Sequence, residues 1–291
     1  TDQFASLRDL VRSMEAGSVD TLLILGGNPV YSTPVDLNFA DALTKVNLRI
    51  HLGLYNDETA FLCHWHIPEA HFLESWSDGR AYDGTLSILQ PLIAPLYDGK
   101  TSHELLAAFT NRPDRSSYEI LRDYWRRNWP GAAVPKDTRQ SKVPSTQTEG
   151  FDHFERQWRQ AIHDGFIAGT ALPAKKTSMN AGLVNQLQPT AISSNQANSQ
   201  LEIIFRPDPH IFDGRFANNG WLQELPKPHT RLTWDNAALV SPATAQKLRL
   251  NNEELVELSY QGRKVEAAVW ILPGQSPNSV TLHLGYGRTR T

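Results

Sequence analysis

Cysteine is almost absent from this chain of 291 residues, in which Cys63 is the single example. A disulfide bond within the chain is therefore excluded, because it needs two cysteines. A thiolate-held iron-sulfur cluster takes about four cysteines. Any such redox centre would have to lie in another polypeptide segment.

Excess charge and long apolar runs are also lacking. The formal net charge is -3, and the positive field that nucleic acid binding requires is missing. The longest apolar runs, "TLLILGG" and "LSILQPLIAPLY", are shorter than the roughly 20 residues that cross a bilayer, and no charged-then-apolar leader opens the chain. We expect a globular protein with room for two domains, no nucleic acid partner and no direct membrane insertion. The chain begins without methionine, and we expect it to be part of a longer protein.

The first part of the chain alternates helical and strand patterns. Apolar spacing predicts a helix over 4–16, and Thr21–Leu25 is apolar on both faces, as is typical of a central parallel strand. Thr33 is a candidate cap for a second helix. A second strand is predicted over Leu48–Leu54, and "NDETAFLCHWH" predicts a third helix that ends before Pro68. This order is typical of a Rossmann-like parallel sheet.

The middle of the chain is less regular. Glycine, proline and aspartate dominate 78–100, which predicts a long ordered loop. Helices are predicted over 102–109, 116–128 and 151–164. The stretch from 130 to 150 lacks apolar periodicity and is interpreted as a linker, and 175–200 is polar.

Strand alternation dominates from about residue 200 onward. "ELVELSY", "KVEAAVW" and "SVTLHLG" each alternate, with turns at Gln261-Gly262 and Pro273-Gly274 between them. A short helix, Ser241–Leu248, precedes these strands, with Ser241 as its cap. Strands around one short helix predict a small β-barrel.

The order of these motifs resembles one known family. "LLILGGNPVYSTPVDLNFADAL", "DETA", "IPEAHFLES" and "QPLIAPLYDGKTSHELLAAF" look like the late part of the molybdopterin oxidoreductases, and "SPATAQKL" with "LVELSYQGRKVEAAVWILPG" is similar to their C-terminal barrel. The resemblance implies an α/β protein: a Rossmann-like domain over 1–130, a linker and helical connection over 131–199, and a double-psi β-barrel over 200–291.

Within that family, "WHIPEAHFLESWSDGRAYDGTLSILQPLIAPLY" looks most like the large iron-sulfur subunit of bacterial alternative complex III. This resemblance implies a scaffold region of a quinol-oxidising respiratory complex. It also implies iron-sulfur clusters elsewhere in the parent protein, an upstream twin-arginine signal, a location on the periplasmic side of the inner membrane, and other subunits as partners.

Gly26, Gly27 and Asn28 form the candidate cofactor-binding site. Backbone N–H groups and an amide at the carboxyl end of a strand suit a phosphate or a base. The alternative is a tight turn that uses glycine for its backbone freedom, because no third glycine completes G-x-G-x-x-G. Measured against the family pattern, Thr85 replaces an arginine, and Arg249 and Asn252 to Glu254 replace barrel glycines. These departures disfavour a bound molybdopterin in this chain.

The other candidate groups each have a structural alternative. His64, His66 and His71, with Glu69 and Glu74 nearby, are of the kind that zinc accepts, but hydrogen-bonded loop histidines are the preferred interpretation because their spacing does not suit one helix face. No metal site is predicted.

The aromatic run "YEILRDYWRRNW" allows base stacking or core packing. The near-neutral charge favours packing of Tyr118, Leu121, Trp125 and Trp129. Asp57 and Glu58 are interpreted as helix N-terminal acids. No nucleophile motif surrounds the serines or Cys63, so no catalytic residue is predicted.

Three functions therefore stay open. The first is a cofactor-free scaffold region of an electron-transfer subunit. The second is part of an active oxidoreductase that uses molybdopterin guanine dinucleotide, and the third is a stand-alone nucleotide-binding module.

Overall fold

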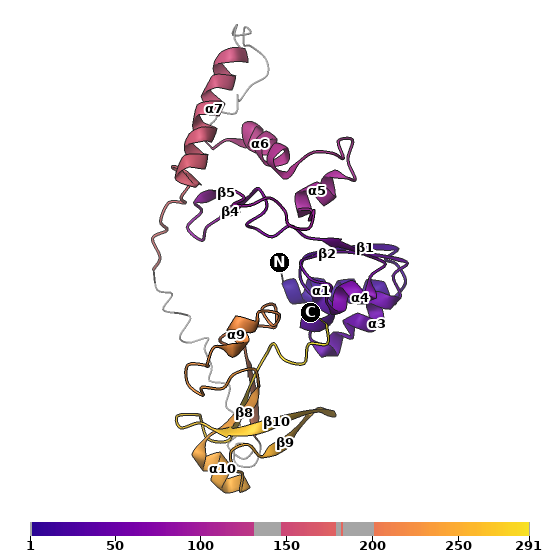
Figure 1. Cartoon of the computed structure of the whole chain (residues 1–291), viewed down its shortest axis with the longest axis vertical. Helices are drawn as coiled ribbons and strands as arrows, with labels where there is room; N and C mark the ends of the chain where they lie inside the picture. The colour runs from indigo at the N-terminus through magenta and orange to yellow at the C-terminus, as the bar shows by residue number, and fades with distance from the viewer. Residues whose placement is uncertain (1, 131–146, 179–181, 183–200, 291) are drawn as a thin grey trace.

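The computed structural model describes residues 2–130, 147–178, 182 and 201–290, arranged as three units (Figure 1). Each unit contains one sheet: a parallel sheet β1-β2-β3, a hairpin sheet β4-β5-β6, and a five-stranded sheet in the order β7-β11-β8-β10-β9. The structure thus confirms a mixed α/β architecture that starts with a parallel sheet and ends with a curled, barrel-like sheet.

The first unit is the Rossmann-like part. Its elements are α1 (Gln3–Glu15), β1 (Thr21–Leu25), α2 (Pro29–Ser32), the 3-10 helix η1 (Val35–Leu37), α3 (Phe39–Thr44), β2 (Leu48–Gly53), α4 (Glu58–Leu62) and β3 (Trp65–Pro68). β2 is the central strand, and it pairs in parallel with both neighbours. Met14 and Leu43 are fully buried between α1 and α3, and they anchor the core that covers the sheet.

Two predictions for this unit are wrong. Thr33 ends α2 instead of capping a helix, because α2 begins directly after Asn28 with Pro29 in its first turn. The predicted third helix stops at Leu62, and the residues after Cys63 form β3. Trp65 to Pro68 are extended because their backbone completes the ladder along β2.

The second unit combines a hairpin sheet with three helices. Its elements are β4 (Ser77–Arg80), β5 (Leu86–Leu89), α5 (Ser102–Ala107), α6 (Ser117–Asn128), α7 (Gln147–Asp164) and β6 (Phe166–Ile167). The hairpin corrects the prediction of a loop over 78–100, whereas all three predicted helices are confirmed. Leu121, Trp125 and Trp158 are buried in one core, as the packing interpretation of the aromatic run requires. The predicted linker and polar stretch fall largely outside the described residues, although 147–150 already belong to α7.

The third unit contains β7 (Glu202–Arg206), α9 (Gly220–Glu224), β8 (Ala237–Val240), α10 (Pro242–Leu248), β9 (Leu255–Tyr260), β10 (Arg263–Ile271) and β11 (Ser279–His283). β9 and β10 form the predicted hairpin around Gln261-Gly262, and Ser241 caps α10 through the N–H of Thr244 at 3.0 Å. The sheet is mixed, because β8 pairs in parallel with β10 and antiparallel with β11. A closed double-psi barrel stays a prediction.

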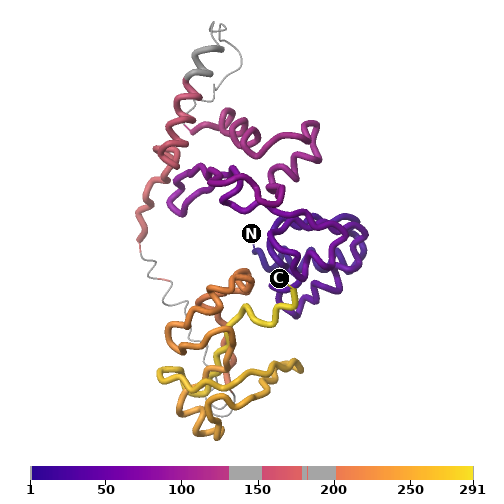
Figure 2. The backbone as a smooth tube through the Cα atoms, viewed as in Figure 1, coloured from indigo at the N-terminus to yellow at the C-terminus, as the bar shows by residue number. Residues whose placement is uncertain are grey.

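The end of the chain returns from the third unit to the first, as the yellow segment in Figure 2 shows. Tyr31 donates its hydroxyl hydrogen to the carbonyl of Tyr286 at 2.6 Å, and Arg288 reaches Glu58 at the start of α4. We call residues 284–290 the C-terminal strap. It places side chains of the last residues against the turn that follows β1.

Within the residues that the structure describes, no helix combines the length and the apolar character needed to cross a membrane.

Candidate functional site

The turn after β1 lies at the carboxyl edge of the parallel sheet. Gly26 and Gly27 both have left-handed backbone angles, with φ of 70° and 73°, which glycine adopts without steric cost. The N–H of Gly26 donates to the carbonyl of Leu52 at 2.8 Å and holds the turn against β2. The two glycines are therefore needed by the turn itself, whether or not a ligand binds there.

Asn28 directs its amide at the first turn of α4. Its Nδ2–H donates to Oε2 of Glu58 at 2.6 Å, and its Oδ1 accepts from the N–H of Thr59 at 3.2 Å and from the hydroxyl of Thr59 at 2.7 Å. Both acceptor positions of the amide oxygen are filled from within the chain. Asn28 thus ties the turn to α4.

Glu58 lies where Asn28 meets the C-terminal strap. Its Oε1 accepts from the N–H of Thr289 at 2.7 Å and of Arg290 at 3.1 Å, and the guanidinium of Arg288 donates Nε–H to Oε2 at 3.0 Å. Burial alone would raise the pKa of Glu58, but the hydrogen bonds from Thr289, Asn28 and Arg288 lower this pKa to about 2. We call this group of contacts the Glu58 clasp.

Two aromatic rings support the clasp. The guanidinium of Arg290 lies 3.4 Å from the ring centroid of Phe61, and that of Arg288 lies 5.2 Å from the ring centroid of Tyr31. Such contacts stabilise a cation beside a ring face. They help to hold the strap over the first turn of α4.

A second carboxylate, that of Glu69, stands over the glycine turn. A Cβ atom on Gly26 would lie 3.6 Å and 3.8 Å from its two oxygens. Burial raises the pKa of Glu69, and across the described residues no group donates a hydrogen bond to the carboxylate. The approach to Gly26 is therefore lined by an acid and not by a cation.

A buried histidine lies beneath the same turn. His51 on β2 is fully buried, and its Nε2 donates to the carbonyl of Gly27 at 3.0 Å. In the tautomer that carries its hydrogen on Nε2, the Nδ1 of His51 accepts, and the Nδ1 of His66, 3.2 Å away, is the donor. Room for the ring comes from Gly53, where a Cβ atom would lie 2.4 Å from Cε1 of His51. His51 was not predicted from the sequence, although a histidine within an apolar strand is a signal of a buried polar contact.

The histidines that the sequence grouped are separated in the structure. His64 accepts from the backbone N–H of Arg49 at 3.1 Å, and His71 accepts from the N–H of Leu73 at 3.3 Å. His66 faces His51, and burial together with this neighbour lowers the pKa of His66. Throughout the described ranges, no group of three or more His, Cys, Asp or Glu side chains is placed to hold a metal ion.

The remaining candidates have structural roles. Asp57 caps α4 by accepting from the N–H of Ala60 at 2.9 Å, as predicted. Burial raises the pKa of Cys63, so its thiol is not activated. Thr85 lies in the β4–β5 turn and donates its N–H to Asp83 at 2.9 Å. In the barrel-like unit, Arg249 is left-handed with φ of 58° without being glycine.

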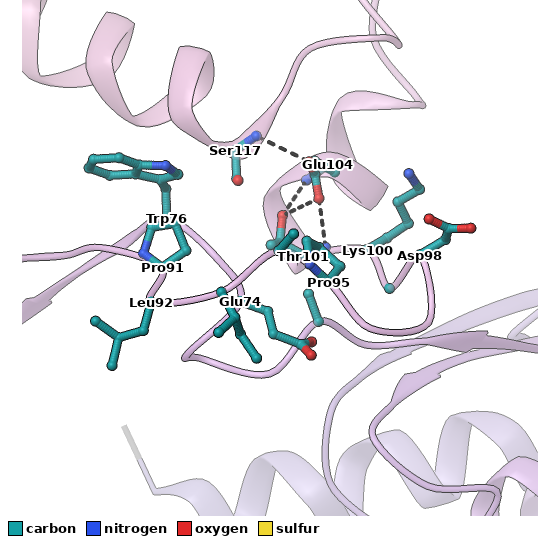
Figure 3. A pocket seen from close by; sticks show the side chains of 14 residues that line it. Glu74, Trp76, Pro91, Leu92, Pro95, Asp98, Lys100, Thr101, Glu104 and Ser117 are labelled. Carbon is teal, nitrogen blue, oxygen red and sulfur yellow. Dashed lines mark hydrogen bonds between the residues drawn. The ribbon is translucent and has the colours of Figure 1, made fainter.

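A cavity of about 610 Å³ lies away from the glycine turn, in the second unit (Figure 3). The loop that carries Pro91 and Pro95 forms one wall, and the starts of α5 and α6 form another. Glu104 accepts from the N–H groups of Thr101 at 2.8 Å and Ser117 at 3.2 Å, so its carboxylate fastens α5 to α6. None of the three predicted cofactor-binding residues lines this cavity.

Comparison with known proteins gives one relative that matches nearly the whole chain and a second that matches about a third of it. It is 25% identical over 293 residues to the menaquinone reductase, molybdopterin-binding-like subunit of Nitratidesulfovibrio vulgaris, which covers 96% of this chain and 37% of the relative. It is 29% identical over 106 residues to the NADPH-Fe(3+) oxidoreductase subunit alpha of Geobacter sulfurreducens, across 36% of this chain and 13% of that protein. No family model matches the chain.

A solved structure has the same fold. Acetylene hydratase from Pelobacter acetylenicus superposes with a TM-score of 0.60 at 15% sequence identity, over 95% of this chain and 39% of that one. The chain thus spans well under half the length of each of these proteins. Together these findings support the molybdopterin oxidoreductase-like relationship that the motifs indicate.

Proposed function

We propose that this chain is a cofactor-free scaffold region of a molybdopterin oxidoreductase-like subunit in an electron-transfer complex. The relatives support the redox setting, because both are named as subunits and one as molybdopterin-binding-like. No step of catalysis is assigned to this chain. Its role is to hold other parts of the subunit, and other subunits, in place.

The observation that carries the proposal is the Glu58 clasp. A nucleotide at this turn would need the amide of Asn28 and the space in front of it. The amide oxygen is already committed to Thr59, and one amide hydrogen is committed to Glu58 at 2.6 Å. Arg288, a cation beside these groups, is paired with Glu58 at 3.0 Å.

The charge beside Gly26 also opposes a pterin dinucleotide. The carboxylate of Glu69 lies where a phosphate would approach the backbone, and like charges repel more strongly where water is partly excluded. The residues present therefore do not fit the anionic cofactor, and we derive no chemistry from it. The non-glycine residues Arg249 and Glu253 at left-handed positions are consistent with this interpretation.

Four more specific features of the proposal rest on the sequence resemblance. They are a place in a quinol-oxidising complex like alternative complex III, a double-psi barrel in the third unit, iron-sulfur clusters elsewhere in the parent protein, and a periplasmic location. Cysteine pairs of the type C-x-x-C on the C-terminal side of the parent gene would support them. An N-terminal cluster motif with a molybdenum-ligating Ser or Cys would instead support an active enzyme.

Molybdenum and pterin analysis of the full-length protein tests the proposal. Metal content is measured by mass spectrometry and pterin by the fluorescence of its oxidised product, with a known molybdopterin enzyme purified in parallel as the positive control. We expect neither molybdenum nor pterin above background. Stoichiometric amounts of both would overturn the scaffold proposal in favour of the catalytic alternative.

A further inference from the structure

The third unit carries a cavity of about 280 Å³, separate from the glycine turn. Thr281 on β11 and Leu239 on β8 are paired in register and both line it. Their neighbours along the strands, Val240 and Val280, belong to the core. Because strand side chains alternate between faces, the cavity lies on the sheet face opposite to that core. Its apolar lining residues are Pro207, Pro209, Pro228, Leu239 and Leu272.

Basic groups converge on this cavity, whereas no carboxylate lines it. The basic lining residues are Arg206, Lys227, His229 and His283. Lys227 is already neutralised, since its ammonium lies 3.2 Å from Oδ2 of Asp208 and donates to the carbonyl of Asp235 at 2.7 Å. The side chains of the other three form no hydrogen bond or ion pair with any described residue. The charge of Arg206 is therefore uncompensated at the cavity.

A hydrogen-bond network next to the cavity fixes the segments that carry its lining residues Pro207, Pro209 and Lys227. Oδ1 of the buried Asp208 accepts from the N–H groups of His210 at 2.9 Å and Ile211 at 3.1 Å, and its Oδ2 accepts from the hydroxyl of Tyr286 at 3.2 Å. The hydroxyl oxygen of Tyr286 also accepts a hydrogen bond from the ammonium of Lys227. Three prolines in the wall restrict the backbone further. A cavity that is formed before binding loses less entropy when a ligand enters.

We propose that this cavity binds a small aromatic carboxylate, with the ring against the prolines and leucines and the carboxylate at Arg206 and His283. An apolar cavity with a few convergent polar groups is the usual form of a small-molecule site, and a guanidinium is the preferred partner of a carboxylate. The site is independent of the scaffold role proposed above.

His283 makes binding dependent on pH. Burial lowers the pKa of His283. The charge of Asp208 raises this pKa, whereas the positive charges of Lys227 and Arg206 lower it further. His229 is the remaining titratable group of the lining. The free imidazole is therefore neutral at pH 7. A bound carboxylate favours the imidazolium and raises the pKa of His283, so binding takes up a proton. Affinity should tighten as the pH falls from about 8 to about 6.

The experiment is a calorimetric titration of the full chain with 1-naphthoate, and with 1-naphthamide as a neutral probe of the same shape. We expect saturable binding of the acid and at least tenfold weaker binding of the amide. Arg206→Ala should weaken naphthoate binding about tenfold or more, which corresponds to about 1.4 kcal/mol. Arg127→Ala, an exposed arginine on α6, is the matched control and should leave the affinity unchanged.

A second variant separates the site from a general charge effect. His283→Gln should keep weak naphthoate binding but remove its pH dependence, and circular dichroism checks that each variant is folded. The proposal is overturned if the acid does not bind saturably or binds no more tightly than the amide. It is equally overturned if Arg206→Ala behaves like Arg127→Ala.

Discussion

The Glu58 clasp makes a quantitative prediction about stability. Glu58→Gln keeps the shape of the side chain but removes the charge that Arg288, Thr289, Arg290 and Asn28 contact. The strap would then lose its charge-assisted contacts with α4. We expect the variant to unfold more easily than the wild type at neutral pH.

The magnitude follows from the lowered pKa of Glu58. A fall from 4.5 to about 2 corresponds to about 3.5 kcal/mol at roughly 1.4 kcal/mol per pKa unit, and because the contacts from Thr289 and Arg290 are exposed to solvent, we expect a loss of about 2 to 3 kcal/mol. A carboxyl with a lowered folded-state pKa stabilises the fold fully above its unfolded pKa. This contribution is lost as the pH falls toward the folded value. The difference between wild type and Glu58→Gln should therefore shrink to about 1 kcal/mol near pH 3.

Urea denaturation followed by tryptophan fluorescence measures this difference at pH 7 and at low pH. Glu266→Gln, at an exposed position on β10, is the control and should change stability by less than about 0.5 kcal/mol. A loss below about 1 kcal/mol at pH 7, or a difference that does not shrink in acid, would refute the reasoning.

Three further substitutions test the packing, each by urea denaturation. Trp158→Ala should cost about 3 to 5 kcal/mol because the side chain is 2% exposed in the second core, and a loss below about 1 kcal/mol would contradict that packing. Gly53→Ala should cost about 1 to 3 kcal/mol because its new methyl group collides with His51; an unchanged midpoint would show that the ring can move aside. Asp208→Asn should cost about 3 to 5 kcal/mol because it leaves Lys227 buried without its anion, and stability like the wild type would show that the pair is dispensable.

The sequence was sufficient where local signals and burial agree. α10 has a serine cap followed by proline, and the helices over 102–109 and 116–128 begin at capping boxes at Thr101 and Ser116. β1 is apolar from Leu22 to Leu25. Such elements form where the pattern predicts because the cap, the periodicity and the core all favour the same conformation.

The errors occurred where pairing partners decide the structure. β3 contains histidine, tryptophan and proline, and it is extended because β2 offers an open edge. β4 and β5 are short strands in a segment rich in glycine and aspartate, and their pairing with each other and with β6 fixes them. Short strands carry too few residues for alternation to be recognised.

Only some residues of the candidate site could be predicted from the sequence. Gly26, Gly27 and Asn28 were found from their position after a strand. The partners Glu58 and Arg288 are separated by 230 positions, and no local pattern links them. The strap has no apolar periodicity, so only the folded structure shows that it closes on α4.

The most direct test of the central claim, that the glycine turn is occupied by the chain's own side chains, is a calorimetric titration of the chain with guanosine diphosphate. The account predicts no saturable heat, for the wild type and for Asn28→Ala alike. Saturable binding by the wild type that Asn28→Ala abolishes would contradict it, because the turn would then be a working nucleotide site.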